Sequence, residues 1–68
     1  MLDDTDRKIL AFFGRVYDRE KRAPTVREVS EVIGLNLQST HRRLMILVGL
    51  GKLAHRQTSG GMGIFTLP

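Results

Sequence analysis

The chain of 68 residues carries 11 lysines and arginines against 7 aspartates and glutamates, a net charge of +4. One domain of this size buries only roughly 60% of the surface that its unfolded chain exposes, which excludes a deep catalytic cavity and favours a compact binding module. The share of hydrophobic residues, 41%, excludes a disordered tail, and the lack of cysteine excludes a disulfide framework, a thiolate metal site and a redox motif.

The first predicted element is a helix that starts directly after Asp3. Asp3 is suited to be its N-cap, and the carboxylates of Asp4 and Asp6 favour the positive end of the helix dipole. Apolar residues recur at spacings of three and four, and their expected inner face consists of Ile9, Leu10, Phe12, Phe13, Val16 and Tyr17. The helix is expected to end between Asp18 and Pro24, because a proline disfavours helix in the residue before it.

A second helix, two turns long, is predicted to begin at Val26. Thr25 and Glu28 have the spacing of a capping box, in which each side chain binds a backbone amide that the helix start leaves free. The expected inner face consists of Val26, Val29, Val32 and Ile33. Gly34 stands where a left-handed residue closes a helix, and Leu35 is expected to fill the core between the helices.

A third helix is predicted over residues 37–50, with Asn36 as its N-cap. The positions expected to face inward are Thr40, Leu44, Leu47 and Val48. The polar residues between them, Gln38, Ser39, His41 and Arg42, are expected to face solvent, and the same spacing favours an outward position for Met45. Two short helices joined by a tight turn are typical of a helix-turn-helix.

Met45 and Ile46 are unusual in such a helix, which commonly carries charge between its inner residues. Packing into the core is the simpler interpretation of both side chains. The alternative is an exposed apolar patch that docks a second copy of the chain or another protein.

Beyond Gly51, the segments 53–56 and 64–67 are predicted to pair as a β-hairpin with a flexible, glycine-rich tip. Two strands alone are unstable, so part of the hairpin is expected to share the core of the first helix through Leu53, Ile64, Phe65 and Leu67. The predicted fold is therefore mainly α with a small β-hairpin. It is a three-helix winged helix-turn-helix, with residues 1–68 as a single domain.

The charges are divided unequally along the chain. Residues 1–31 hold 7 acids and 7 bases, whereas residues 32–68 hold 4 bases and no acid. The second half is therefore expected to attract a polyanion. Because an α-helix fits the major groove of DNA, the predicted partner is double-stranded DNA, with the helix over residues 37–50 as the recognition helix.

The polar residues of the recognition helix supply suitable chemistry for base edges and phosphates. Gln38 can pair bidentately with adenine and Arg42 with guanine. Asn36, Ser39 and His41 can donate to a base or a phosphate, depending on how deeply the helix enters the groove. Which base each residue contacts stays open.

Other residues are expected to contact the DNA backbone around the recognition helix. Free amides at the start of the second helix offer an anion site, which makes Thr25 and Arg27 candidate phosphate contacts. Arg43, Lys52 and Arg56 are expected to add positive charge at the edges. A homodimer on DNA is expected, because one short helix reads too few bases by itself.

The sequence resembles the N-terminal domain of LexA-type repressors over nearly its entire length. The resemblance is carried by PTVREVSEVIGL at residues 24–35, LMILVGLGKL at residues 44–53 and the closing TLP at residues 66–68. It implies a winged helix-turn-helix repressor that binds an operator as a dimer, with Gln38, Ser39, His41 and Arg42 at the reading positions. Generic winged-helix transcription regulators fit almost as well.

The sequence departs from the LexA-type pattern in three places. The third helix is about one residue shorter at its start, and the hairpin tip, residues 57–63, lacks the basic residue that commonly contacts DNA. The self-cleaving serine–lysine protease domain of that family has no counterpart in this sequence. The resemblance therefore assigns no role to the hairpin and carries over no cleavage mechanism.

Other classes of site are not expected. His41 and His55 are the only histidines, and no paired carboxylate stands at ligand spacing, so we expect no metal site. The glycine-rich stretch 60–63 does not open a helix as a dinucleotide loop does. Without a nucleophile, base and orienting group, we expect no enzyme, no cofactor and no small-molecule substrate.

No membrane partner is expected either. The longest apolar run, residues 44–50, is far shorter than the roughly 20 residues that cross a bilayer. The acidic start lacks the basic region of a secretory signal. The expected location is the cytoplasm, with association to the nucleoid if the cell is bacterial.

The sequence is compatible with two functions from different classes. The first is sequence-specific binding of double-stranded DNA by a transcriptional regulator, in the manner of a repressor. The second is a winged-helix protein-interaction module that inhibits or bridges a larger assembly through Met45, Ile46 and the uncharged hairpin tip. The operator sequence and the direction of regulation stay open.

Overall fold

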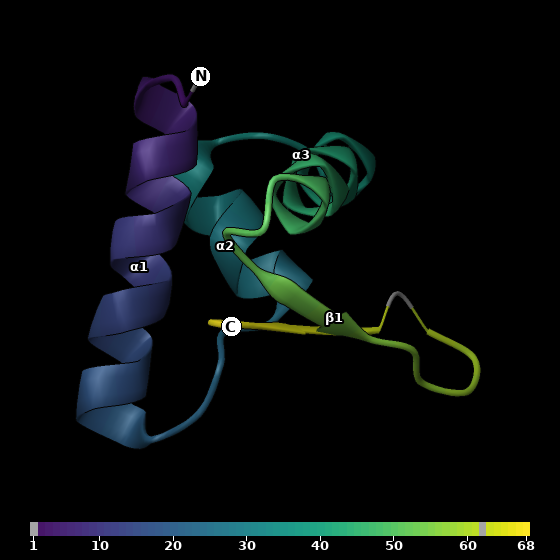
Figure 1. The fold of residues 1–68 in the computed structure, drawn as a ribbon. Coiled ribbons are helices and arrows are strands. Elements are labelled where there is room, and N and C mark those ends of the chain that lie inside the picture. The colour runs from purple at the N-terminus through teal and green to yellow at the C-terminus, as the bar shows by residue number, and fades with distance from the viewer. Residues whose placement is uncertain (1, 62) are drawn as a thin grey trace.

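The computed structural model describes residues 2–61 and 63–68, so that Met62 of the hairpin tip lies outside the described residues. Three helices are followed by two antiparallel strands: α1 (Asp4–Glu20), α2 (Val26–Ile33), α3 (Leu37–Gly49), β1 (Ala54–Arg56) and β2 (Ile64–Thr66). α2 packs against both α1 and α3, and β1 packs against α3. The hairpin runs away from α1, so that its tip projects on the far side of the molecule (Figure 1). The predicted winged helix-turn-helix is confirmed.

Each helix begins at its predicted N-cap. The side chains of Asp3, Thr25 and Asn36 each accept the backbone N–H three residues further on. The first two caps are reciprocal, because the carboxylates of Asp6 and Glu28 accept the backbone N–H of the cap residue. The helix boundaries are therefore determined by local residues.

The turn between α2 and α3 depends on Gly34. Its φ of +73° lies in the left-handed region, which glycine adopts without the steric cost that a Cβ would impose. The backbone N–H groups of Gly34 and Leu35 both donate to the carbonyl of Ser30. This closes α2 and lets α3 start at Leu37, three residues after Gly34, which is the tight reversal expected of a helix-turn-helix.

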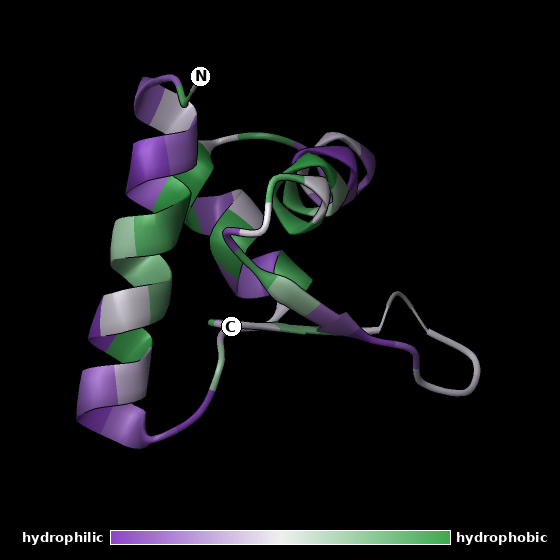
Figure 2. Cartoon of the chain, viewed as in Figure 1, coloured by the Kyte–Doolittle hydropathy of each residue, from purple (hydrophilic) through white to green (hydrophobic). Residues whose placement is uncertain are grey.

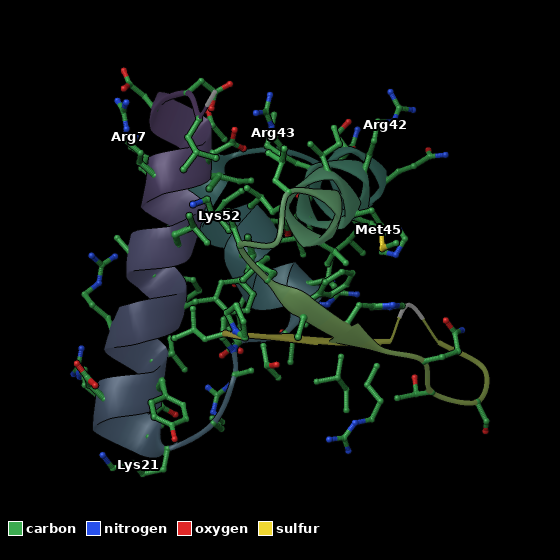
Figure 3. All side chains as sticks on the ribbon, viewed as in Figure 1. Arg7, Lys21, Arg42, Arg43, Met45 and Lys52 are labelled. Carbon is green, nitrogen blue, oxygen red and sulfur yellow. The ribbon has the colours of Figure 1, made fainter. Side chains whose placement is uncertain are left out.

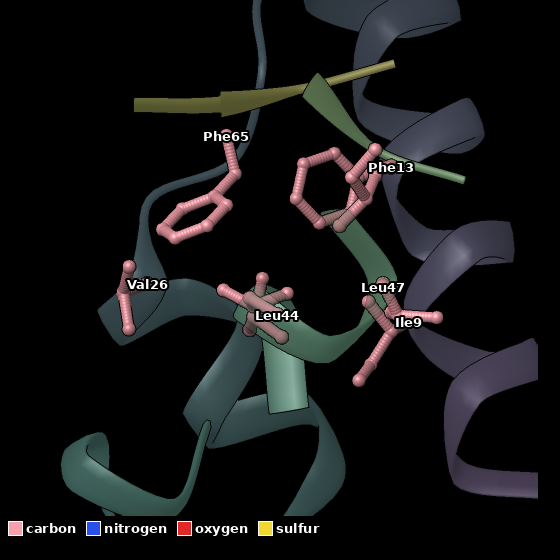
Figure 4. Close-up of a cluster of buried hydrophobic side chains, with 8 residues drawn as sticks. Ile9, Phe13, Val26, Leu44, Leu47 and Phe65 are labelled. Carbon is pink, nitrogen blue, oxygen red and sulfur yellow. The ribbon is translucent and has the colours of Figure 1, made fainter. Parts of the chain in front are cut away.

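The core takes side chains from all three helices and the hairpin. Its buried apolar members are Ile9, Phe13, Val16, Val26, Val29, Leu44, Leu47, Leu53 and Phe65. In the close-up, Phe13 of α1 and Phe65 of β2 lie beside each other above Leu44 of α3 (Figure 4). The hydrophobic stretches of α1 and α2 are turned toward each other, and hydrophilic residues gather at both ends of α1 (Figure 2). The hairpin is thus held on the helices through Phe65 and Leu53.

Five residues expected in the core lie instead at the surface: Tyr17, Val32, Leu35, Ile64 and Leu67. On α2, Ser30 takes the inner position expected of Val32, because it stands four residues after the buried Val26 and three before the half-buried Ile33. Side chains alternate along a strand, so burial of Phe65 turns Ile64 outward.

The other three residues lie beyond the elements that would cover them. Leu35 follows the reversal at Gly34 and is 38% exposed. Tyr17 belongs to the last turn of α1, and Leu67 follows the end of β2. Tyr17 and Leu67 instead line an open surface pocket beside the chain end.

Thr40 is the one buried side chain of α3 that carries a hydroxyl. It is fully buried, and its Oγ1 has no hydrogen-bond partner among the described residues. A buried polar group without a partner costs about 1–3 kcal/mol. The position is therefore expected to be suboptimal for stability.

Replacement of Thr40 by valine should raise the free energy of unfolding by about 1 kcal/mol, because a methyl group takes the place of the unpaired hydroxyl. Urea denaturation of both proteins measures the difference. Thr40→Ser, which keeps the hydroxyl and removes the methyl, should be less stable than wild type. A Thr40→Val protein that is less stable than wild type would show that the hydroxyl is hydrogen-bonded in solution.

Candidate nucleic-acid interface

One line of side chains on α3 faces away from the core. An α-helix turns once in 3.6 residues, so residues four and seven positions apart lie nearly in line. Gln38, Arg42 and Met45 have this spacing and are exposed, while Leu44 and Leu47 on the inner side are fully buried. Arg42 and Met45 lie on the side of α3 turned away from α1 (Figure 3). We call Gln38, Arg42 and Met45 the outer row of α3.

Two further predicted reading residues lie beside the outer row and are half-buried. Ser39 belongs to a surface groove of about 280 Å³ lined by Leu35, Ser39, Arg42, Arg43 and Ile46. His41 lies on the hairpin side, where its ring meets Phe65 edge-on with centroids 5.6 Å apart. Ser39 and His41 are therefore placed to contact a ligand only at the margins of the outer row.

The hairpin is joined to α3 through aromatic rings. Phe65 contacts His41 of α3 on one side, and the ring of His55 from β1 lies 4.6 Å from it in a tilted arrangement. Gly63 makes the return of the chain possible: its φ is +89°, and a Cβ there would clash with His55 Nε2 and with the carbonyl oxygen of Arg56. The position of the hairpin relative to the outer row is thus fixed by packing.

Arg43 points to α1 and not to the outer row. Its Nη1 donates to Asp3 Oδ2 at 2.9 Å and to Asp6 Oδ1 at 3.2 Å. These bonds, first to Asp3 and then to Asp6, raise the pKa of Arg43. The pKa of Asp3 is lowered, first by the Asp6 backbone N–H and then by Arg43. Asp6 is only 6% exposed, so Arg43 compensates a nearly buried carboxylate.

The start of α2 does not offer Thr25 as a free anion site, contrary to the expectation from sequence. The Thr25 backbone N–H donates to Glu28 Oε1 at 2.8 Å, and Thr25 Oγ1 accepts the Glu28 N–H. Arg22 donates to both carboxylate oxygens of Glu28, each at 2.8 Å. A carboxylate thus already lies where a phosphate was expected. Arg27, in the first turn of α2, is exposed and remains a candidate phosphate contact.

Three other predicted contacts, Asn36, Lys52 and Arg56, do not belong to the outer row. Asn36 Oδ1 accepts the Ser39 backbone N–H at 2.7 Å, which leaves the amide NH₂ to donate. Lys52 lies toward α1 (Figure 3). Arg56 follows His55 on β1 and, since side chains alternate, points to the opposite face of the hairpin. Of the basic residues predicted at the interface, Arg42 alone belongs to the outer row.

Met45 and Ile46 are both exposed, by 39% and 55%. Packing into the core is therefore the wrong interpretation of these residues. They also face different ways: Ile46 lines the groove with Leu35, whereas Met45 does not. The outward position of Met45 agrees with the helical spacing of the sequence, which places it seven residues after Gln38.

Comparison of the chain with models of protein families, with curated proteins and with solved structures gives no match. Over residues 2–61 and 63–68, the helices lack the combination of length and apolar character needed to cross a bilayer. The same residues contain no group of three or more His, Cys, Asp or Glu arranged to hold a metal ion.

Removal of the Arg43 side chain should destabilise the fold more than removal of its exposed neighbour Arg42. In Arg43→Ala, the nearly buried Asp6 carboxylate loses its cationic partner, whereas Arg42→Ala leaves no buried charge behind. Thermal unfolding of the two variants at neutral pH measures this difference. Equal melting temperatures would contradict a structural role for the link between α3 and α1.

The stability of the fold should decrease in acid partly because of Glu28. Its pKa is lowered from 4.5 to about 2, first by Arg22 and then by the Thr25 backbone N–H. The folded protein therefore favours the carboxylate more than the unfolded chain does. This contribution is complete above pH 4.5 and is lost as the pH falls toward about 2.

Glu28→Gln preserves a residue suited to the capping box but cannot titrate. Between pH 4.5 and about 2, the unfolding free energy of Glu28→Gln should fall less than that of wild type. The unfolding free energy of Glu28→Gln should still fall somewhat as the pH decreases, because the lowered pKa of Asp3 acts in the same direction. Denaturant titrations at several pH values test this, and parallel curves for the two proteins would refute the assignment.

Proposed function

We propose that this chain is the DNA-binding domain of a transcriptional regulator and that α3 enters the major groove of double-stranded DNA. The observation that carries the proposal is the outer row, where Gln38 and Arg42 project one turn apart from a helix whose other side is buried. Glutamine and arginine can form bidentate hydrogen bonds with adenine and guanine in the major groove. A helix fixed by its core side presents these groups without a large ordering cost.

The distribution of charge supports a polyanionic partner. All 7 acidic residues precede residue 32, so α3 and the hairpin carry no carboxylate side chain. Four of these acids, Asp3, Asp6, Glu20 and Glu28, form ion pairs with Arg43 or Arg22. A phosphate backbone that approaches the outer row therefore meets little local repulsion.

The resemblance to LexA-type repressors supports a repressor-like regulator that binds as a homodimer. Two copies supply the two half-sites that one helix of 13 residues cannot read alone. Such a regulator would act in the cytoplasm, on the nucleoid if the cell is bacterial. The proposed activity needs neither an enzyme centre nor a cofactor.

Gln38→Ala and Arg42→Ala should each weaken binding to a preferred duplex by about 1–3 kcal/mol, because each removes one bidentate base contact. The preferred duplex is first selected from a random pool, and affinities are then measured by fluorescence anisotropy. Arg19→Ala, at the exposed end of α1, is the matched control and should bind like wild type. If both outer-row variants retain wild-type affinity, the assigned reading face is wrong.

Arg27→Ala should change the dependence of DNA affinity on salt concentration but not the preference for a DNA sequence. Loss of one phosphate contact lowers the slope of log K against log salt by about 0.9. Affinities of wild type and Arg27→Ala for preferred and scrambled duplexes at four salt concentrations provide the measurement. An unchanged slope would remove Arg27 from the interface.

A second candidate function is supported by the groove beside the outer row. Leu35 and Ile46 line it, and Leu50 at the end of α3 is also exposed. Such an apolar patch suits a protein-interaction module that inhibits or bridges a larger assembly. Ile46→Ser, which removes the apolar surface without adding charge, would then abolish binding of the protein partner, while Gln38→Ala would not. Under the leading proposal, Ile46→Ser leaves DNA affinity nearly unchanged and Gln38→Ala reduces it.

A further inference from the structure

Met45 is an exposed apolar side chain in an otherwise polar row. Its neighbours along that row are Arg42, three residues before it, and Gln38, seven residues before it. It does not line the groove formed by Leu35 and Ile46, so the apolar patch does not account for it. Met45 is 39% exposed and therefore does not belong to the core. If the outer row contacts a ligand, Met45 contributes most to the affinity when it meets an apolar group of that ligand.

The geometry of α3 places Met45 at one end of that contact. From Gln38 to Met45 the helix rises about 10.5 Å at 1.5 Å per residue, which corresponds to about three steps of 3.4 Å along DNA. The next position in line is Gly49, which has no side chain, and a Cβ built there would meet nothing within 4 Å. Met45 is therefore the last side chain that the row offers to a base pair.

The floor of the major groove presents one apolar group, the 5-methyl of thymine, which 5-methylcytosine shares. Methionine suits this group, because its unbranched, polarisable side chain adapts to irregular apolar surfaces. We infer that Met45 recognises a pyrimidine 5-methyl group about three base pairs from the base that Gln38 contacts. The inference rests on the proposed DNA binding and makes Met45 a specificity-determining residue of that site.

Duplexes that lack a single methyl group test this inference. After selection of the preferred duplex, each thymine is replaced in turn by deoxyuridine, which removes only the methyl group. One replacement per half-site should weaken wild-type binding about fourfold, since burial of one methyl is worth about 0.8 kcal/mol. Restoring the methyl through 5-methylcytosine, compared with cytosine at the same position, should strengthen binding by a similar factor.

The protein variants assign this effect to one side chain. Met45→Ala should bind the thymine and deoxyuridine duplexes equally, because the contact with the methyl is gone. Ile46→Ala, an exposed neighbour outside the outer row, is the matched control and should keep the fourfold difference. Circular dichroism of both variants verifies that they fold as wild type does.

The possible outcomes separate this inference from the proposed function. If a duplex is selected but no deoxyuridine replacement changes the affinity, or if Met45→Ala retains the fourfold difference, the inference is overturned and DNA binding stands. If the random pool yields no preferred duplex, the proposed function fails and the inference fails with it.

Discussion

The packing of Leu44 and Leu47 against the hairpin and α1 is the interaction on which the rest of the structure depends. Both side chains are fully buried, and they lie in one cluster with Phe13 and Phe65. Because a helix is rigid, the choice of its buried side also determines which residues project on the other. Rotation of α3 by one residue, about 100°, would bury the outer row.

Two further contacts restrain α3 at its sides. On the α1 side, Arg43 bonds to Asp3 and Asp6, so a residue that could have served as a free cation instead orients the helix. On the hairpin side, His41 meets Phe65, which also contacts His55. The hairpin therefore supports α3 through ring packing. This role does not require the basic tip residue that the LexA-type pattern would lead one to expect.

The helices and their boundaries were predictable because they are encoded locally. Asp3, Thr25 and Asn36 each cap a helix through a residue only three positions away, and Gly34 adopts the left-handed conformation that ends α2. Burial was harder to predict, because it depends on which elements cover a side chain. Leu35 shows this: its apolar character suggested the core, but after the reversal at Gly34 it lies at the surface and is 38% exposed.

For the candidate site, too, exposure could be predicted from the sequence, whereas contacts between distant residues could not. The exposure of Gln38 and Arg42 followed from helical periodicity alone. The role of Arg43 did not, because it pairs with Asp3 and Asp6, 40 and 37 positions away. The capping box of Thr25 and Glu28 was predicted, but the bonds from Arg22 to the Glu28 carboxylate were not. Long-range ion pairs of this kind cannot be read from local sequence.

The central claim is that the outer row of α3 is the surface that contacts DNA. Its most direct test is an NMR titration of the isotope-labelled chain with a selected duplex, followed at the side-chain signals of the outer row. The account predicts that the Gln38 amide, the Arg42 guanidinium and the Met45 methyl shift together, while signals from the C-terminal half of α1 stay in place. Shifts of Leu35 and Ile46 in the groove, with Gln38 and Met45 unchanged, would contradict it.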